Sequence, residues 1–228
     1  MSVENNYIGL NPLLYKAAKN GEYGQQHSFD KGNITDAMFV FLDGKPSEDS
    51  AVFLDKNYRG RPLVCLSEEW ENHIREHYPQ VKEYKRCMMK PICHFELDKV
   101  KTLPEGFEAR SFDKEAFELH PFSHGKNYPS FESFSQSGAG AVVWHENKIV
   151  ASASSFFTYN NEVELDVSTD ESCRGKGLAS ACTALMLQDC EKRGIIVHWD
   201  AQNEPSRGLA EKFGFEVECY YNVYVITE

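Results

Sequence analysis

Long hydrophobic runs are missing from this chain of 228 residues, and no stretch approaches the ~18 apolar residues of a membrane-spanning helix. The N-terminus also lacks the basic start and apolar run of a secretory signal. We therefore expect a soluble, unexported protein without a membrane partner. Its seven cysteines form an odd number with no paired CxxC spacing, which argues against a zinc knuckle or a disulfide framework. Reduced thiols and a cytoplasmic location are predicted.

Positive charge is also scarce. The chain has 24 Lys and Arg against 35 Asp and Glu, which gives a net charge of −11. A surface that binds nucleic acid needs a basic excess, and no basic cluster appears beyond Lys82 to Arg86. We expect no nucleic-acid partner. A cationic substrate suits this balance, although acidic charge also serves simply to keep a protein in solution.

A zinc motif is present only in part. The segment from His73 to His77 has the HxxEH spacing of inverted zincins, which places two imidazoles on one helical face. A catalytic zinc needs a third protein ligand, and the first half of the chain offers no companion motif. We expect no metal site.

Two domains are expected, with the boundary at the turn Pro104-Glu105-Gly106. Residues 1–104 are predicted to form an N-terminal α/β domain, and residues 105–228 the second domain. The first domain is expected to contain a helix to Lys19 with Asn11 as its cap and Pro12 at its first position. Next come a polar stretch (20–33), apolar runs that suit a small sheet (37–42, 51–54 and 62–66), a helix capped by Ser67 and a strand (84–89).

The second domain is expected to alternate helices and strands. The predicted elements are a strand at 107–110, helices at 113–119 and 128–135, a hairpin of 140–145 and 148–158, a strand at 162–169, a helix at 178–192, a strand at 195–199 and a closing strand at 217–226. In the strand 162–169, apolar and acidic side chains alternate between the two faces.

A glycine-rich loop, from Cys173 to Ala179, separates that strand from the helix at 178–192. Loop amides and the positive helix end can converge on an anion. Gly175 and Gly177 permit positive φ, and the loop adds two basic side chains that a diphosphate would attract. The loop is neither GxxxxGK[ST] nor GxGxxG. It predicts a pyrophosphate site, although an ordinary βαβ crossover with a glycine-rich turn is an alternative.

The pattern Arg-x-x-Gly-x-Ala, at Arg174, Gly177 and Ala179, resembles the acetyl-CoA-binding motif of the GNAT superfamily of N-acetyltransferases. Residues Asn203 to Phe215 resemble its second motif, Asn-x-x-Ser/Ala-x-x-Leu-x-x-Lys-x-Gly-Phe. The layout resembles the bacterial subgroup that includes the zwittermicin A resistance enzyme. This resemblance covers about residues 105–228 and implies an α/β (α+β) GNAT fold, a mixed and mostly antiparallel sheet flanked by helices.

The resemblance implies acetyl-CoA (coenzyme A) as cofactor and a set of residues that bind it through the loop, the strand end and the second motif. The cofactor-binding set is Val167, Ser168, Thr169, Arg174, Gly175, Lys176, Gly177, Leu178, Ala179, Ser180, Asn203 and Ser206. Val167 is expected to polarise the thioester carbonyl through its backbone amide. Asn203 and Ser206 can equally cap the following helix.

Two catalytic residues are predicted. The acidic face of the strand 162–169 offers Glu162, Glu164 and Asp166, and Glu164 is the expected general base; a solvated strand face is the alternative reading. The tyrosine with which the superfamily usually protonates the thiol is replaced here by Ala210. Tyr221 is predicted to deliver that proton, with Tyr220, Tyr224 or water as alternatives and sheet packing as another explanation of these tyrosines.

The resulting hypothesis is an enzyme that moves an acetyl group by direct attack onto a primary amine of a small polar molecule. A protein or peptide amine is the alternative acceptor, and a non-catalytic acyl-CoA sensor is the alternative from another class. A homodimer is allowed as an assembly. Trp199 and Asp200 are expected to be structural rather than a substrate wall.

Overall fold

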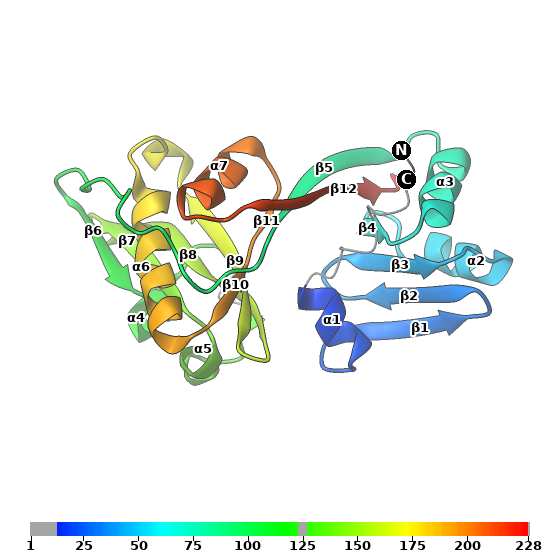
Figure 1. Cartoon of the computed structure of the whole chain (residues 1–228), viewed down its shortest axis with the longest axis horizontal. Helices are drawn as coiled ribbons and strands as arrows, with labels where there is room; N and C mark the ends of the chain where they lie inside the picture. The colour runs from blue at the N-terminus through cyan, green and yellow to red at the C-terminus, as the bar shows by residue number, and fades with distance from the viewer. Residues whose placement is uncertain (1–12, 123–126, 228) are drawn as a thin grey trace. The chain divides into compact units, whose positions relative to one another are not determined.

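The computed structural model describes residues 13–122 and 127–227 (Figure 1). The predicted cap at Asn11 and Pro12 lies outside the described residues. Contacts divide the chain into two compact units. The first consists of two segments, the chain up to Met88 and the chain from Val217 onward, and the second spans Met89–Glu216. The division into domains at residues 104 and 105 stays a prediction.

The first unit is a mixed sheet with helices. Its strands follow the order β1-β2-β3-β4-β12-β5, with β3 and β4 parallel and β12 antiparallel to β4. The elements are α1 (Leu13–Lys19), β1 (Gln25–Phe29), β2 (Gly32–Asp36), β3 (Val40–Gly44), α2 (Glu48–Asn57), β4 (Pro62–Cys65), α3 (Glu68–His77), β5 (Lys82–Met89) and β12 (Val217–Val225).

Two expectations for this unit are corrected. Residues 51–54, predicted as a strand, lie inside helix α2, because Ser47 and Ser50 form a capping box and Glu48 and Asp49 occupy the first turn. The polar stretch 20–33 contains β1 and the start of β2, which form an antiparallel hairpin. The helix capped by Ser67 is confirmed, since its hydroxyl accepts from the Trp70 amide.

The second unit contains a five-stranded sheet in the order β10-β9-β8-β7-β6, in which only β9 and β10 are parallel. The predicted mixed, mostly antiparallel sheet flanked by helices is confirmed. The elements are β6 (Phe107–Ser111), α4 (Lys114–Leu119), α5 (Phe131–Ser137), β7 (Gly140–His145), β8 (Lys148–Tyr159), β9 (Glu162–Thr169), a 3₁₀ turn (Glu171–Cys173), α6 (Leu178–Arg193), β10 (Ile196–His198), β11 (Asp200–Ala201) and α7 (Glu204–Lys212).

The sequence signals for the centre of this unit are confirmed. The β7–β8 hairpin turns at Glu146 and Asn147, whose φ values are 48° and 61°. Val163 and Leu165 are buried on β9 as the alternation predicts, and helix α6 packs on strands β6 to β9. Gly194, with φ 65°, ends α6. Packing of this buried face therefore holds β9, the strand that leads into the glycine-rich loop, in place.

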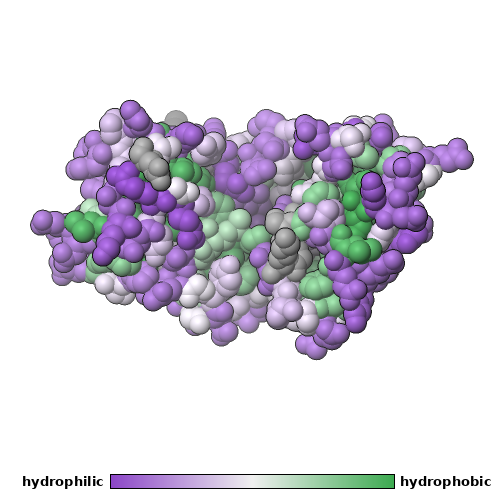
Figure 2. Space-filling model, turned by 180° about the vertical axis from the view of Figure 1, so that it is seen from behind, coloured by the Kyte–Doolittle hydropathy of each residue, from purple (hydrophilic) through white to green (hydrophobic). Residues whose placement is uncertain are grey.

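Hydrophilic residues predominate on the face shown in Figure 2, in keeping with the acidic composition. None of the described helices has both the length and the apolar character needed to cross a bilayer.

A buried carboxylate joins the last strand to helix α3 in the first unit. The Glu71 side chain accepts from the Tyr224 hydroxyl at 2.5 Å and from Arg75 Nη2 at 2.9 Å. Burial, followed by the hydrogen bond to Glu71, raises the pKa of Tyr224 above its usual value. Because Glu71 is only 8% exposed, each lost donor leaves it short of solvation.

We expect Tyr224→Phe to lower the free energy of unfolding by about 1–3 kcal/mol, because the buried Glu71 carboxylate loses a donor that water cannot replace. Urea titration followed by circular dichroism measures this change. Tyr84→Phe is the control, since Tyr84 is 52% exposed on β5. Equal stability of the two variants would contradict this account of Glu71.

Candidate functional site

Strand β9 has a partner on one side along its whole length and on the other side only at its start. Strand β8 is registered against β9 from Glu162 to Thr169, whereas β10 is registered only against Glu162, Val163 and Glu164. The second half of β9 thus extends beyond the last registered residue of β10. Its main chain is positioned to pair with an extended ligand there.

The chain then passes through a 3₁₀ turn into the glycine-rich loop. Gly175 and Gly177 have φ values of 77° and 81°, so the positive φ predicted for both is confirmed. A Cβ built on either glycine meets no atom within 4 Å. The space over the loop is therefore open, and glycine is required by the backbone conformation and not by crowding.

Gly177 is also the N-cap of helix α6, and it offers no side-chain oxygen to the helix amides. The first turn carries no acidic residue. The first intrahelical bond runs from the Ala181 amide to the Gly177 carbonyl, so the preceding amides have no acceptor within the helix. This end of a 16-residue helix can accept an anion.

Two basic side chains extend from the loop. Arg174 Nη1 lies 3.4 Å from Glu171 in an exposed pair, and Lys176 Nζ lies 5.0 Å from the ring centre of Phe107. An exposed ion pair of this kind contributes little by itself. The Arg174 side chain can therefore exchange Glu171 for a phosphate at small cost.

A polar atom at the end of β9 supports a ligand here. The Thr169 hydroxyl oxygen is buried and has no hydrogen-bond partner among the described residues. Buried hydroxyls without partners are rare in folded proteins, and a ligand amide would supply the missing donor. Together with the open glycine loop, this atom fits a coenzyme that has both an amide-containing arm and a diphosphate.

Asn203 and Ser206 have structural contacts of their own. The Asn203 side chain accepts from the Ser206 amide at 2.9 Å and caps α7. The Ser206 hydroxyl accepts from Trp199 Nε1 at 3.1 Å, and the Trp199 ring is 3% exposed and packs 5.3 Å from Phe215. These contacts favour the structural reading of Trp199, and cofactor binding by Asn203 and Ser206 stays a prediction.

The acidic face of β9 is not uniform. The Glu162 carboxylate is 2.6 Å from His198 Nε2 on β10, and both side chains are 14% exposed. Glu164 is registered against His198 and Phe157. No motif marked His198, because the pairing joins residues far apart in the sequence. Glu162 is thus engaged by an imidazole, and the role of Glu164 as general base stays a prediction.

The three candidate tyrosines belong to the first unit. Tyr221 is 8% exposed in a core cluster with Tyr15, and Tyr224 is bound to Glu71. Tyr220 is 40% exposed, with Lys85 Nζ 4.6 Å from its ring centre. Burial therefore agrees with the packing alternative for Tyr221 and Tyr224, and the catalytic role of Tyr221 stays a prediction.

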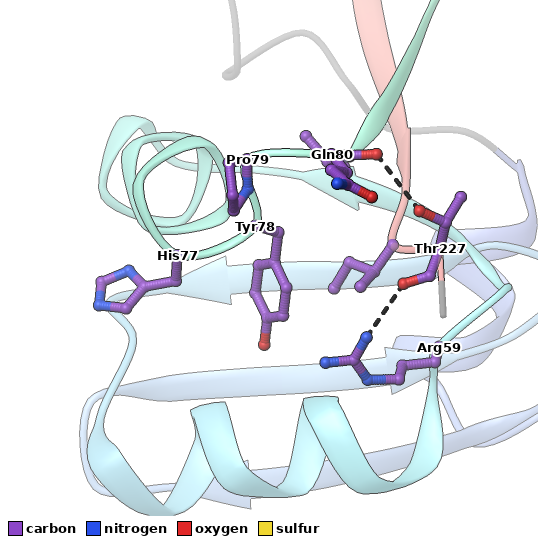
Figure 3. Close-up of a pocket in the computed structure, with 8 residues that line it drawn as sticks. Arg59, His77, Tyr78, Pro79, Gln80 and Thr227 are labelled. Carbon is purple, nitrogen blue, oxygen red and sulfur yellow. Dashed lines mark hydrogen bonds between the residues drawn. The ribbon is translucent and has the colours of Figure 1, made fainter.

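The zincin-like residues of helix α3 lie beside a cavity in the first unit. His73 and His77 stack with ring centres 4.2 Å apart, and residues 13–122 and 127–227 contain no group of three metal-ligating side chains. A cavity of about 230 Å³ lies next to His77 in the first unit (Figure 3). Arg59 lines this cavity, and its guanidinium forms an ion pair with Asp55 at 2.6 Å and donates to the Thr227 carbonyl at 3.0 Å.

Comparison with known proteins identifies relatives of the whole arrangement. Residues 23–224 match the family model described as GNAT acetyltransferase. The chain is 26% identical over 171 residues to the uncharacterized N-acetyltransferase YdfB of Bacillus subtilis (strain 168), an alignment that covers 71% of this chain and 64% of that relative. The chain thus spans less than two thirds of the length of this curated relative.

Solved structures agree. A GCN5-related N-acetyltransferase-like protein from Streptococcus suis 89/1591 superposes with a TM-score of 0.82 and 28% identity over 96% of this chain and 95% of its own. A GCN5-related N-acetyltransferase from Kribbella flavida has a TM-score of 0.64 and 13% identity over 93% and 94% of the two chains. At that identity, the second likeness supports the fold alone.

We expect Gly177→Ala to lower the free energy of unfolding by about 1–2 kcal/mol, because alanine must adopt a left-handed conformation at the start of α6. Gly208→Ala is the matched control: Gly208 lies in α7 and also faces open space, so alanine should leave stability unchanged or raise it. Thermal unfolding of both variants measures the difference. A Gly177→Ala protein as stable as Gly208→Ala would contradict the left-handed conformation of residue 177.

Proposed function

Because the chain belongs to the GNAT acetyltransferase family, we propose that it is an acetyl-CoA-dependent N-acetyltransferase that acts on a primary amine of a small polar molecule. Acetyl-CoA is the acyl donor of that family. The proposal assigns the cofactor to the second half of β9 and the loop that follows.

The observation that carries this proposal is the loop from Arg174 to Gly177. Two left-handed glycines turn the chain so that helix α6 begins without a side-chain cap, facing open space. The diphosphate would accept hydrogen bonds from the amides of residues 174–180. The pantetheine arm would lie along Val167 to Thr169, where the unpartnered Thr169 hydroxyl is available to it.

The reaction needs a polarised carbonyl and a proton acceptor. The substrate nitrogen attacks the thioester carbonyl, the C–N bond forms, the C–S bond breaks and the coenzyme leaves as a thiolate. We assign polarisation of the carbonyl to the Val167 amide, whose donor would bind the developing oxyanion. The proton lost by the amine goes to Glu164, directly or through a water molecule.

Glu164 remains our choice over its neighbour Glu162. Glu162 and His198 already form a close pair, so this carboxylate is less available to the amine. Glu164 also lies two residues nearer to Val167 along β9, about 7 Å at the rise of a strand. Asp166, the third carboxylate of this face, is nearer still to Val167, so the preference for Glu164 over Glu162 rests on the pairing of Glu162 with His198.

The proton for the thiolate is the least constrained step. The position that usually carries a tyrosine is Ala210, which is fully buried on α7 and has no acidic proton. We retain Tyr221 as the proposed donor, although its burial agrees with a packing role. Water can replace it, because a thiolate is a tolerable leaving group near neutral pH.

A small polar amine is the proposed acceptor, as the resemblance to the zwittermicin A resistance subgroup implies. The excess of acidic residues favours a cationic acceptor. All seven cysteines are free thiols, which suits a reducing compartment, and a cytoplasmic location is part of the proposal. We propose no nucleic-acid partner, and a homodimer stays an allowed assembly.

The test is a thiol-release assay with acetyl-CoA and a panel of aminoglycosides, polyamines and peptides. Thiol release with small amines supports the proposal, and release with peptides alone would move the acceptor to a protein. Tight binding of acetyl-CoA by calorimetry without turnover on any amine would indicate a sensor. If neither coenzyme A nor acetyl-CoA produces binding heat, the proposed site is wrong.

We expect Glu164→Gln to lower kcat by about 100-fold at neutral pH, because the amide cannot accept the proton, while the dissociation constant for acetyl-CoA stays unchanged. Single-substrate kinetics and calorimetry measure the two quantities. Glu115→Gln, on the exposed side of α4, is the control and should retain full turnover. Full activity in Glu164→Gln would remove Glu164 from the mechanism.

A further inference from the structure

Lys212, at the end of helix α7, is a half-buried ammonium without an acidic partner among the described residues. Its Nζ donates to the Ser180 hydroxyl at 2.5 Å and lies 5.9 Å from the ring centre of Phe213. Several other lysines of this acidic chain form ion pairs with carboxylates. Lys90 Nζ, for example, lies 2.8 Å from the Glu216 carboxylate. Lys212 therefore lacks a counter-charge that would compensate its partial desolvation.

Two further sources of positive potential act at the same place. Ser180 is in the first turn of α6, so the Lys212 ammonium lies beside the positive end of that helix. Burial, and then repulsion by Lys101, lowers the pKa of Lys212. Lys101 comes from the segment before β6, so residues remote in the sequence gather cationic charge here.

Three acidic residues of the neighbouring segments form ion pairs with cations other than Lys212. Glu204 and Glu211, on the same helix as Lys212, lie 2.6 Å and 3.7 Å from Arg207. Glu96, from the segment that also carries Lys101, forms a close pair with Lys99. Asp98, in the same segment, acts on Lys99, so no carboxylate forms an ion pair with Lys212 among the described residues, and an anion from outside the chain would supply that partner.

We propose that Lys212 and Lys101 bind the phosphate monoester of the coenzyme beside the Ser180 side chain, whereas the diphosphate is assigned to the main-chain amides of residues 174–180. This inference rests on the proposed function. A phosphate monoester carries a charge of about −1.5 to −2 near pH 7, so it gains most from two ammonium groups. The Ser180 hydroxyl accepts from Lys212 and keeps its own proton, which it can donate to a phosphate oxygen.

The first experiment uses the wild-type protein and compares coenzyme A with dephospho-coenzyme A, which lacks only the monoester. We expect calorimetry to show binding of coenzyme A about 100-fold tighter, as for the loss of two charge-assisted contacts of about tenfold each. The difference should shrink at high salt. Equal affinities would overturn the monoester subsite while leaving the proposed function intact, whereas no binding of either ligand would refute the proposed function.

The second experiment uses variants. Lys212→Gln should raise the dissociation constant for coenzyme A about tenfold and leave that for dephospho-coenzyme A unchanged. Lys101→Gln should also raise the dissociation constant for coenzyme A and leave that for dephospho-coenzyme A unchanged. Lys212→Arg should bind coenzyme A as the wild type does. Lys114→Gln, an exposed lysine on α4, is the charge-matched control.

Loss of affinity for both ligands in Lys212→Gln would overturn the inference, because it would place Lys212 at the diphosphate or in the packing of α7. Thermal unfolding of each variant separates those two results. An unchanged affinity for coenzyme A in Lys212→Gln would also overturn it. Should Lys212→Gln fail to fold, Lys101→Gln and the wild-type comparison decide the question.

Discussion

The proposed coenzyme site depends on one constraint of the main chain: β9 must end and α6 must begin within a short glycine-rich loop. Hydrogen bonds to β8 hold β9 up to Thr169, and α6 packs back on the same sheet, so the connection has little freedom. Left-handed conformations at Gly175 and Gly177 satisfy this geometry. A side chain at Gly177 would meet no neighbouring atom, but its backbone would be strained at the positive φ. Glycine is therefore required here by conformation and not by lack of space.

The sequence was sufficient where a signal is local. Glycines at 175, 177 and 194 mark left-handed positions, and the alternation along 162–169 marks a strand with one buried face, so the loop and its flanking elements were predictable. Helix α2 replaces the predicted strand at 51–54 because the capping serines and the acidic first turn start a helix that includes this apolar run of four. The hairpin within 20–33 is not predicted from the sequence, because strand β1 is mostly polar and exposed and so shows no apolar alternation.

Contacts between distant residues were beyond the reach of such signals. The pair of Glu162 and His198 forms because two strands are parallel and in one register, and no spacing in the sequence encodes it. Lys212 gains its position from the approach of α7 to the first turn of α6. The second motif predicted that helix but not which charge would lack a partner, since that depends on the carboxylates of other segments.

Charge changes sign between strand β9 and the glycine-rich loop. The strand carries Glu162, Glu164 and Asp166 and is followed by Asp170 and Glu171, and the basic side chains begin only at Arg174 and Lys176. A net charge of −11 would repel an anionic coenzyme at long range, but physiological salt screens that repulsion beyond about 8 Å. Within that distance Arg174, Lys176 and the positive end of α6 would attract the coenzyme phosphates. An acidic protein can thus hold an anion locally, provided that its basic groups lie in contact with the ligand, while its remaining charge favours a cationic amine.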